Sequence, residues 1–203
     1  MDGIIEFFFD CSSPWTYLAF HNILKLAPQF DAAIEWRPIL VGGIFNTINP
    51  SVYQSRERPV PAKARYAQKD LADWAWVAGL KIIRPTIFPV NSVKAMRGCI
   101  VQEPEGRLVA FARAVFEAYW ADDRDIADEA VLADICRKIG SDPQAFLTRI
   151  ARQTIKDKLR QNTDELIARG GFGSPTIYLD GDDMYFGNDR LPLVQAALER
   201  RWR

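Results

Sequence analysis

Ser13-Pro14-Trp15-Thr16 stands between two segments whose patterns predict different secondary structures. The preceding run, Ile4-Ile5-Glu6-Phe7-Phe8-Phe9-Asp10, is short and rich in β-branched and aromatic residues, which predicts a buried strand. The following residues place apolar side chains at helical spacing: Tyr17, Leu18, Phe20, Ile23, Leu24 and Leu26. A strand, a tight turn and a helix start bring backbone N–H groups and the Ser13 hydroxyl to the positive end of a helix, an arrangement that binds anions. An ordinary N-cap serine is the alternative explanation of the same residues.

Helical patterns fill the middle of the chain. Residues 33–41 predict a second strand, so the opening strand, helix and strand favour a right-handed parallel βαβ unit. A long loop, of the kind that often covers a functional site, is expected from Gly42 to about Pro61. Helices are expected at about 62–79, 91–102, 106–121, 128–139, 143–151 and 152–169. We therefore expect one domain formed by residues 1–60 and 170–203, and an inserted helical subdomain, residues 61–169.

The C-terminal segment predicts a β-hairpin followed by a helix. Residues 176–179 and 184–186 are short strand patterns, and Asp180-Gly181 between them is a strong hairpin signal. A last helix is expected from about Leu191 to Trp202. The order βαβ, helical insertion, ββα is that of an α/β thioredoxin fold interrupted after its second strand. Redox members of that fold carry Cys-X-X-Cys where this chain has Ser13 to Thr16. A serine cannot form a disulfide, but it can donate a hydrogen bond to the thiolate of another molecule.

Charge and cysteine content argue against several classes of function. Lys+Arg and Asp+Glu both number 26, so the net charge is zero, which argues against nucleic acid as the main partner. No apolar run approaches the ~18 residues of a membrane helix, and no signal-peptide pattern precedes the first strand. Cys11, Cys99 and Cys136 are scattered and His21 is the sole histidine, which argues against a metal site and a structural disulfide. We expect a soluble, cytoplasmic protein that binds no metal.

Two further motifs contain candidate site residues. Ser174-Pro175 follows a glycine-rich turn and directly precedes a strand, so a cis peptide bond is favoured over a trans proline at a strand edge. The residue before such a proline can pair its backbone with an extended, peptide-like ligand. Asn188-Asp189 opens the last helix, where N-capping is one explanation. Binding of a γ-glutamyl group, with its ammonium on the carboxylate of Asp189, is the other.

Six short motifs occur in an order that resembles the family of 2-hydroxychromene-2-carboxylate isomerases and kappa-class glutathione transferases, a DsbA-like group with a thioredoxin fold. The first is Phe9-Asp10-Cys11-Ser12-Ser13-Pro14-Trp15-Thr16-Tyr17-Leu18-Ala19. The others are Pro61-Ala62-Lys63 with Asp70-Leu71, Phe88-Pro89-Val90-Asn91-Ser92, Asn162-Thr163-Asp164-Glu165, Phe172-Gly173-Ser174-Pro175-Thr176 and Phe186-Gly187-Asn188-Asp189-Arg190. The match covers nearly the whole chain.

The resemblance implies a glutathione site, residue by residue. Ser13 corresponds to the serine that hydrogen-bonds the glutathione sulfur, and Ser174, before Pro175, to the residue that pairs with the cysteinyl moiety. Asn188 and Asp189 correspond to the γ-glutamyl contacts, and Lys63 and Asp70 to further tripeptide contacts. Asn49 matches the family's loop asparagine, with Asn46 as a competitor. Ser12 offers a second hydroxyl, but the fold places its catalytic residue immediately before the proline, which favours Ser13.

The implied activity is a glutathione-dependent isomerisation of 2-hydroxychromene-2-carboxylate to trans-o-hydroxybenzylidenepyruvate, in the catabolism of aromatic compounds. A kappa-class-like glutathione transferase acting on small electrophiles is the alternative. A thiol–disulfide oxidoreductase and a non-catalytic glutathione-binding module are weaker ones. The implied partners are glutathione, a small aromatic substrate and a second copy of the chain in a homodimer. Aromatic residues that could line the substrate pocket are Phe8, Trp15, Phe45, Trp74 and Trp76, of which two or three are expected to belong to the core.

Overall fold

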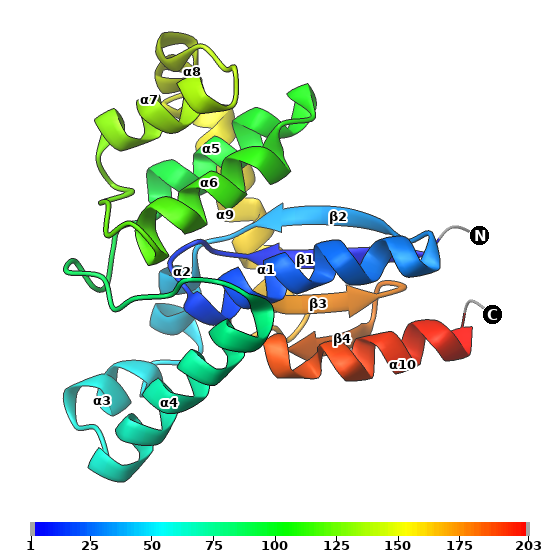
Figure 1. Ribbon diagram of the computed structural model, residues 1–203. Helices are drawn as coiled ribbons and strands as arrows, with labels where there is room; N and C mark the ends of the chain where they lie inside the picture. Colours follow the sequence, from blue (N-terminus) through cyan, green and yellow to red (C-terminus); the bar gives the residue numbers. More distant parts are fainter. Residues whose placement is uncertain (1–2, 202–203) are drawn as a thin grey trace.

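A four-stranded mixed sheet forms the centre of the protein (Figure 1). The structure, a computed structural model, describes residues 3–201 apart from the side chain of Arg56. The strands are β1 (Ile4–Phe9), β2 (Ala33–Pro38), β3 (Thr176–Leu179) and β4 (Asp183–Phe186), in the order β2-β1-β3-β4. β1 pairs in parallel with β2 and antiparallel with β3, and β3 pairs antiparallel with β4. The parallel βαβ unit and the C-terminal hairpin are therefore confirmed.

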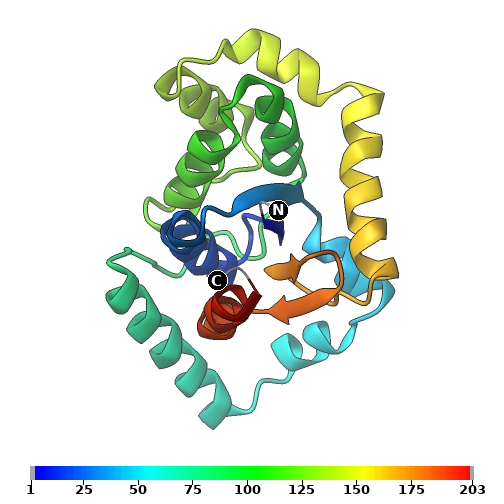
Figure 2. The same cartoon turned by 90° about the vertical axis from the view of Figure 1, so that its right-hand side faces the viewer.

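The central strand β1 is buried on both faces because its aromatic residues alternate between two clusters. Phe7 and Phe9 belong to the larger cluster, where both rings contact Phe20 of α1 (Pro14–Leu26). Phe8 points to the opposite face, where its ring meets that of Tyr178. Helices α1 and α10 (Leu191–Arg201) cover the first face and α9 (Gln153–Ala168) lies along the second (Figure 2).

The segment between β2 and β3 is almost entirely helical. Beyond α9 it contains α2 (Val41–Thr47), α3 (Ser51–Glu57), α4 (Pro61–Ala78), α5 (Val93–Gln102), the short 3-10 turn η2 (Glu103–Glu105), α6 (Leu108–Trp120), α7 (Glu129–Lys138) and α8 (Pro143–Ile150). Two further 3-10 turns lie outside this segment: η1 (Ala27–Phe30) between α1 and β2, and η3 (Asn188–Arg190) between β4 and α10. Helices α5 to α8 stack beside β2, whereas α3 and α4 extend away from the sheet as an arm (Figure 1). The strand order and the helical insertion are thus those expected of a thioredoxin fold interrupted after its second strand. The division into residues 1–60 with 170–203 and residues 61–169 stays a prediction.

Two expectations about the start of the insertion are wrong. Strand β2 ends at Pro38 rather than continuing to residue 41, and the expected loop from Gly42 to about Pro61 contains α2 and α3. Backbone N–H groups at the start of α2 find side-chain partners, since Leu40 N donates to the Thr163 hydroxyl and Val41 N to the Asp10 carboxylate. Helices of seven residues are too short to produce a clear 3.6-residue periodicity, so the sequence pattern did not reveal them.

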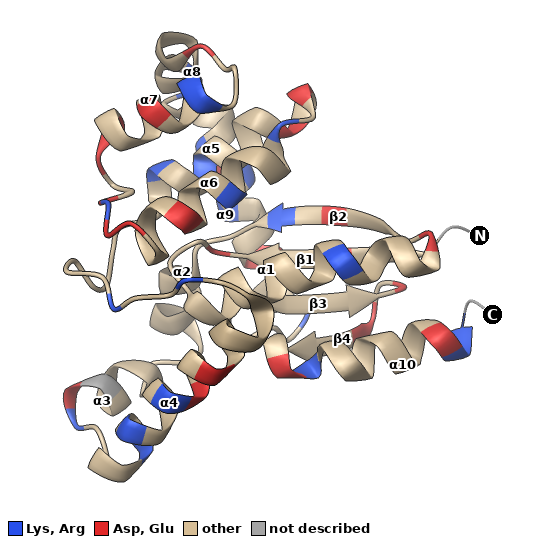
Figure 3. Cartoon of the chain, viewed as in Figure 1, with Lys and Arg blue, Asp and Glu red and all other residues tan. Residues whose placement is uncertain are grey.

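The remaining boundaries follow the sequence patterns closely. The hairpin turn places Asp180 and Gly181 at positive φ (52° and 92°), which explains the Asp-Gly pair. Helix α10 is described as far as Arg201, so the expected end at Trp202 lies outside the described residues. Within residues 3–201, no helix has the length and apolar content needed to cross a membrane. Charges of both signs are interspersed over the helices (Figure 3).

Candidate active site

A cavity of about 790 Å³ opens at the N-terminal end of α1. Five segments surround it: the β1–α1 turn, α2 with the start of α3, the loop before α5, the loop before β3, and the end of β4. Its lining includes Asp10, Ser12, Ser13, Trp15, Phe45, Asn49, Tyr53, Phe88, Pro89, Ser92, Phe172, Ser174 and Phe186. Its volume lies within the ~300–1,000 Å³ typical of small-molecule sites.

Ser13 is the N-cap of α1 and also faces this cavity. Its Oγ accepts a hydrogen bond from the backbone N–H of Thr16 at 3.2 Å, while Pro14 occupies the first turn. The Ser13 hydroxyl donates to the carbonyl oxygen of Ser174 at 3.3 Å, longer than usual for an O–H···O bond. Ser13 can therefore cap α1 and also act in the site. Capping uses a lone pair of Oγ, whereas the hydroxyl proton makes only the long hydrogen bond to Ser174.

The Ser174-Pro175 peptide bond is cis, as the sequence favoured. The Ser174 hydroxyl turns inward, where it accepts from Asp10 N at 2.9 Å and shares a hydrogen bond of 2.8 Å with the Thr16 hydroxyl. These contacts join the end of β1, the start of α1 and the loop before β3. The backbone of Ser174 is thereby held beside the Ser13 hydroxyl.

Asp10 is a functional candidate that sequence reasoning missed, although it stands in the first motif. Its side chain is fully buried and its carboxylate accepts from Ser12 N (2.9 Å), Val41 N (2.9 Å) and the Ser92 hydroxyl (3.1 Å). Burial raises the pKa of the Asp10 carboxyl, and these donors partly oppose the shift. One side chain therefore fixes the β1–α1 turn, the start of α2 and the residue before α5. The sequence signal that could have indicated Asp10 is a carboxylate directly after a predicted buried strand.

Aromatic side chains form much of the cavity wall. Of the five aromatic candidates, Trp15 and Phe45 line the cavity, whereas Phe8 is fully buried in the core. Trp74 and Trp76 lie on α4 outside the lining, and Trp76 is 83% exposed. The wall is completed by residues the sequence reading did not choose, namely Tyr53, Phe88, Phe172 and Phe186. Phe88 precedes a second cis proline, Pro89, in the third motif.

The structure brings Asn49 to the cavity but not the two predicted α4 residues. Asn49 lines it and donates through Nδ2 to the Phe172 carbonyl at 3.2 Å, whereas Asn46 accepts from the Tyr53 hydroxyl. Lys63 is exposed and Asp70 is half-buried on α4, and neither lines the cavity. Their contact with glutathione stays a prediction.

Asn188 and Asp189 lie in η3, which packs against α1, rather than in the cavity lining. Asn188 is buried, accepts from Asn22 Nδ2 at 3.0 Å, and leaves its own Nδ2 without a hydrogen-bond partner. The exposed Asp189 carboxylate is 2.7 Å from Arg190. A carboxylate thus stands on the surface beside a cation, and its role in ligand binding stays a prediction.

The cysteines and the histidine offer no nucleophile or metal site. Cys11, Cys99 and Cys136 are all buried and form no disulfide. Burial raises the pKa of the Cys11 thiol, and the nearby Cys99 thiol raises it further. Burial lowers the pKa of His21, which lies on α1. Within the described part of the chain, no group of His, Cys, Asp and Glu could hold a metal ion.

Comparison with known proteins places this geometry in a family. The DSBA-like thioredoxin domain matches residues 4–199. The 2-hydroxychromene-2-carboxylate isomerase of Pseudomonas putida is 30% identical over 203 residues, 98% of this chain and 96% of the relative. Glutathione S-transferase kappa 1 of Rattus norvegicus is 26% identical, over 98% of this chain and 92% of the relative. A solved structure of a 2-hydroxychromene-2-carboxylate isomerase superposes with a TM-score of 0.84 at 30% identity, covering 97% of this chain and 95% of that one. The chain therefore belongs to the DSBA-like thioredoxin domain family, within the group of 2-hydroxychromene-2-carboxylate isomerases and kappa glutathione transferases.

Proposed function

We propose that the protein is a glutathione-dependent isomerase that converts 2-hydroxychromene-2-carboxylate to trans-o-hydroxybenzylidenepyruvate. The observation that carries the proposal is the position of Ser13, whose hydroxyl lies at the N-terminus of α1, on a cavity walled by aromatic residues and beside a cis proline. The 30% identity to the Pseudomonas putida isomerase over nearly both full chains supports the choice of reaction.

The residues at the cavity fit a peptide thiol. Glutathione, when bound, supplies a nucleophilic thiolate whose reversible addition permits rotation about a substrate double bond. Ser13 would donate its proton to that sulfur, and the N-terminus of α1 would favour the same negative charge. The Ser174 backbone beside Pro175 would pair with the cysteinyl part, and Asn49 would contact the peptide from α2–α3. The aromatic wall, including Trp15 and Phe45, would hold the flat substrate.

Contacts with the ends of the tripeptide are proposed for residues outside the cavity lining. Asp189, with Asn188 beneath it, would hold the γ-glutamyl ammonium group. Lys63 and Asp70 would reach glutathione from α4. Their distance from the sulfur means that these four residues would serve affinity rather than chemistry.

The decisive experiment is to purify the protein and to assay the isomerisation of 2-hydroxychromene-2-carboxylate with and without glutathione. The reaction is followed by the change in absorbance of the substrate. We expect turnover that depends on glutathione, with the thiol recovered unchanged at the end. Binding of reduced glutathione should also give heat in calorimetry at millimolar concentration. Absence of both heat and a thermal shift would refute the glutathione site itself.

A kappa-class-like transferase is the second candidate, and the 26% identity to the Rattus norvegicus protein favours it. The two activities differ in the fate of the thiol. A transferase consumes glutathione in proportion to an electrophile such as a chloronitrobenzene, whereas the isomerase returns it. Titrating free thiol after turnover therefore separates them.

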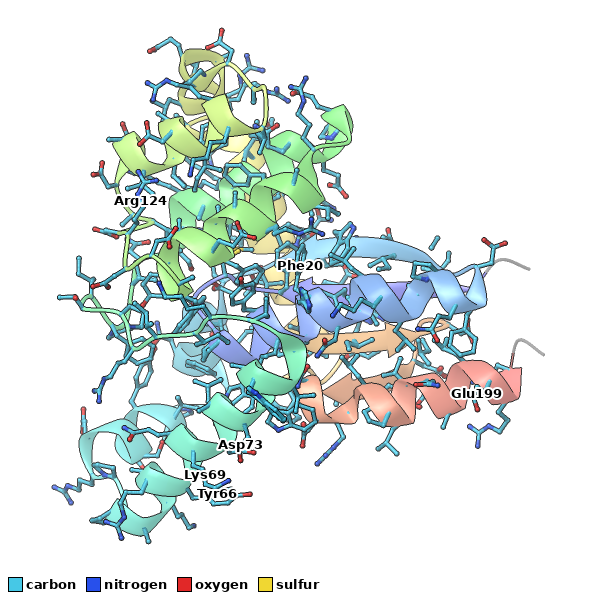
Figure 4. All side chains as sticks on the ribbon, in the orientation of Figure 1. Phe20, Tyr66, Lys69, Asp73, Arg124 and Glu199 are labelled. Carbon is cyan, nitrogen blue, oxygen red and sulfur yellow. The ribbon has the colours of Figure 1, made fainter. Side chains whose placement is uncertain are left out.

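We also propose that the protein acts as a homodimer in the cytoplasm. On α4, Tyr66, Trp76 and Val77 are 66%, 83% and 68% exposed, an apolar surface of the kind that partners cover. Figure 4 shows Tyr66 on this arm together with the exposed pair Lys69 and Asp73. Analytical ultracentrifugation of the wild type and of Trp76→Glu should show a dimer and a monomer, respectively.

A further inference from the structure

A second cavity, of about 330 Å³, lies between α2, α5 and α9. Its lining includes the cationic side chains Arg97, Lys156 and Arg160 and two carboxylates, Asp157 and Asp164. Leu40 and Gly43 line both this cavity and the larger one, so α2 forms the wall between them. Figure 3 shows basic segments on α5 and α9, which pack against each other.

Among the residues that the structure describes, the guanidinium of Arg97 has no counterion. Its Nε is shielded from solvent and makes no hydrogen bond, and no carboxylate within the described residues forms an ion pair with it. Burial lowers the pKa of Arg97, the direction expected for a cation that loses water without gaining an anion. A charged group in this condition is costly unless a ligand or ordered solvent completes it.

Other partly buried arginines of this protein do form ion pairs with carboxylates. Arg37 also leaves its Nε unpaired, but its Nη2 lies 3.0 Å from Glu35. Arg124 lies 2.7 Å from Asp134, and Arg149 pairs with Glu105. Arg97 therefore differs from these arginines in facing a cavity rather than a carboxylate.

The two acidic residues of the lining do not neutralise the site. Asp157 accepts a hydrogen bond from Gln153, and neither Asp157 nor Asp164 forms an ion pair with Lys156 or Arg160 among the described residues. Both carboxylates are exposed, so solvent screens them, whereas Arg97 is half-buried. With three cationic side chains against two carboxylates, the lining carries a net positive charge.

We propose that this cavity is a binding site for a small oxyanion, a carboxylate or a phosphate, held chiefly by Arg97. A planar guanidinium matches such groups in a bidentate manner, and Lys156 and Arg160 add charge from α9. The ligand is small, because the volume lies at the lower end of the range for ligand pockets. Through α2 it would contact the wall of the proposed active site.

The test is calorimetric titration and thermal shift with inorganic phosphate and with benzoate, against sodium chloride at equal ionic strength. We expect at least one of the two anions to bind the wild type. Arg97→Gln should weaken that binding by about 10-fold or more, as for loss of a hydrogen bond to a charged group. Arg200→Gln removes an exposed charge from α10 and should leave the affinity unchanged. Preference for phosphate or for benzoate identifies which source supplies the oxyanion.

Several results would overturn the site. They are no binding above chloride, unchanged affinity in Arg97→Gln, or displacement of the anion by glutathione, which would place it in the larger cavity. If Arg97→Gln does not fold, the exposed Arg160→Gln decides instead, since it should weaken binding several-fold. Because the direct titrations of the anion need neither glutathione nor substrate, absence of binding there would leave the proposed isomerase activity unaffected.

Discussion

Replacing Ser13 by alanine should separate its two roles by producing two independent effects. The Oγ atom accepts from Thr16 N at 3.2 Å, so its loss removes the N-cap of α1. Its proton is directed to the Ser174 carbonyl over 3.3 Å, a weak bond that a bound thiolate would replace. Ser13→Ala therefore affects both helix stability and the ionisation of the bound thiol.

The size of each effect follows from the contacts. Loss of an N-cap hydroxyl lowers the free energy of unfolding by about 1 kcal/mol. Loss of a hydrogen bond to a thiolate costs about 1.5–3 kcal/mol, which at 1.36 kcal/mol per unit raises the pKa of the bound thiol by about 1–2 units. At neutral pH the thiolate population, and with it the turnover rate, should fall roughly 10- to 100-fold.

The assay combines the pH dependence of thiolate absorbance in the glutathione complex with turnover and urea unfolding. Asp128→Ala is the matched control for capping, because Asp128 caps α7 through Ala130 N at 2.8 Å, away from the site. It should lower stability comparably without changing the thiol pKa. Ser12→Ala should change both only slightly, since the backbone N–H of Ser12 still donates to the Asp10 carboxylate at 2.9 Å.

One result would refute the reasoning. If Ser13→Ala loses about 1 kcal/mol of stability, as Asp128→Ala does, but keeps its turnover and thiol pKa, Ser13 is a helix cap only. Partial recovery of turnover at higher pH is expected otherwise, because alkali restores the thiolate without the serine.

Three further predictions concern affinity, pH and packing. Asp189→Ala should raise the dissociation constant of glutathione about 3- to 10-fold while leaving the saturated rate nearly unchanged, which calorimetry and steady-state kinetics would show. The hydrogen bond from Arg169 lowers the pKa of Glu6 below its ordinary value of 4.5, so this contribution to stability is present above that value and lost as the pH falls through the lower folded pKa. The difference in unfolding free energy between wild type and Glu6→Gln, about 1–3 kcal/mol at pH 7, should thus shrink below pH ~4 in urea titrations. Gly98→Ala should lower the melting temperature, because a Cβ at Gly98 would lie 2.6 Å from the ring of Phe111 in a closely packed core and cost about 1–3 kcal/mol or more.

Local sequence patterns predicted the parts of the fold that depend on local interactions. The run from Ile4 to Phe9, the capped start of α1 and the Asp180-Gly181 turn each carry their signal within a few residues. Most insertion helices were also predicted, because they are long enough for their apolar residues to repeat several times. The cis bond at Pro175 was predicted from the turn before it and from the fold.

Only the tertiary structure determined which residues share the cavity. Asp10 and Ser174 are 164 positions apart, yet a 2.9 Å hydrogen bond joins them because β1 and β3 are neighbours in the sheet. The same topology left Lys63 and Asp70 outside the lining and brought in aromatic residues from α3, β4 and two loops, namely Tyr53, Phe88, Phe172 and Phe186. It also left Arg97 without a carboxylate partner among residues 3–201, which no spacing in the sequence indicates. Periodicity and capping report interactions between residues within a few turns of each other, whereas a cavity is formed by side chains whose proximity depends on how the strands pair and how the helices pack.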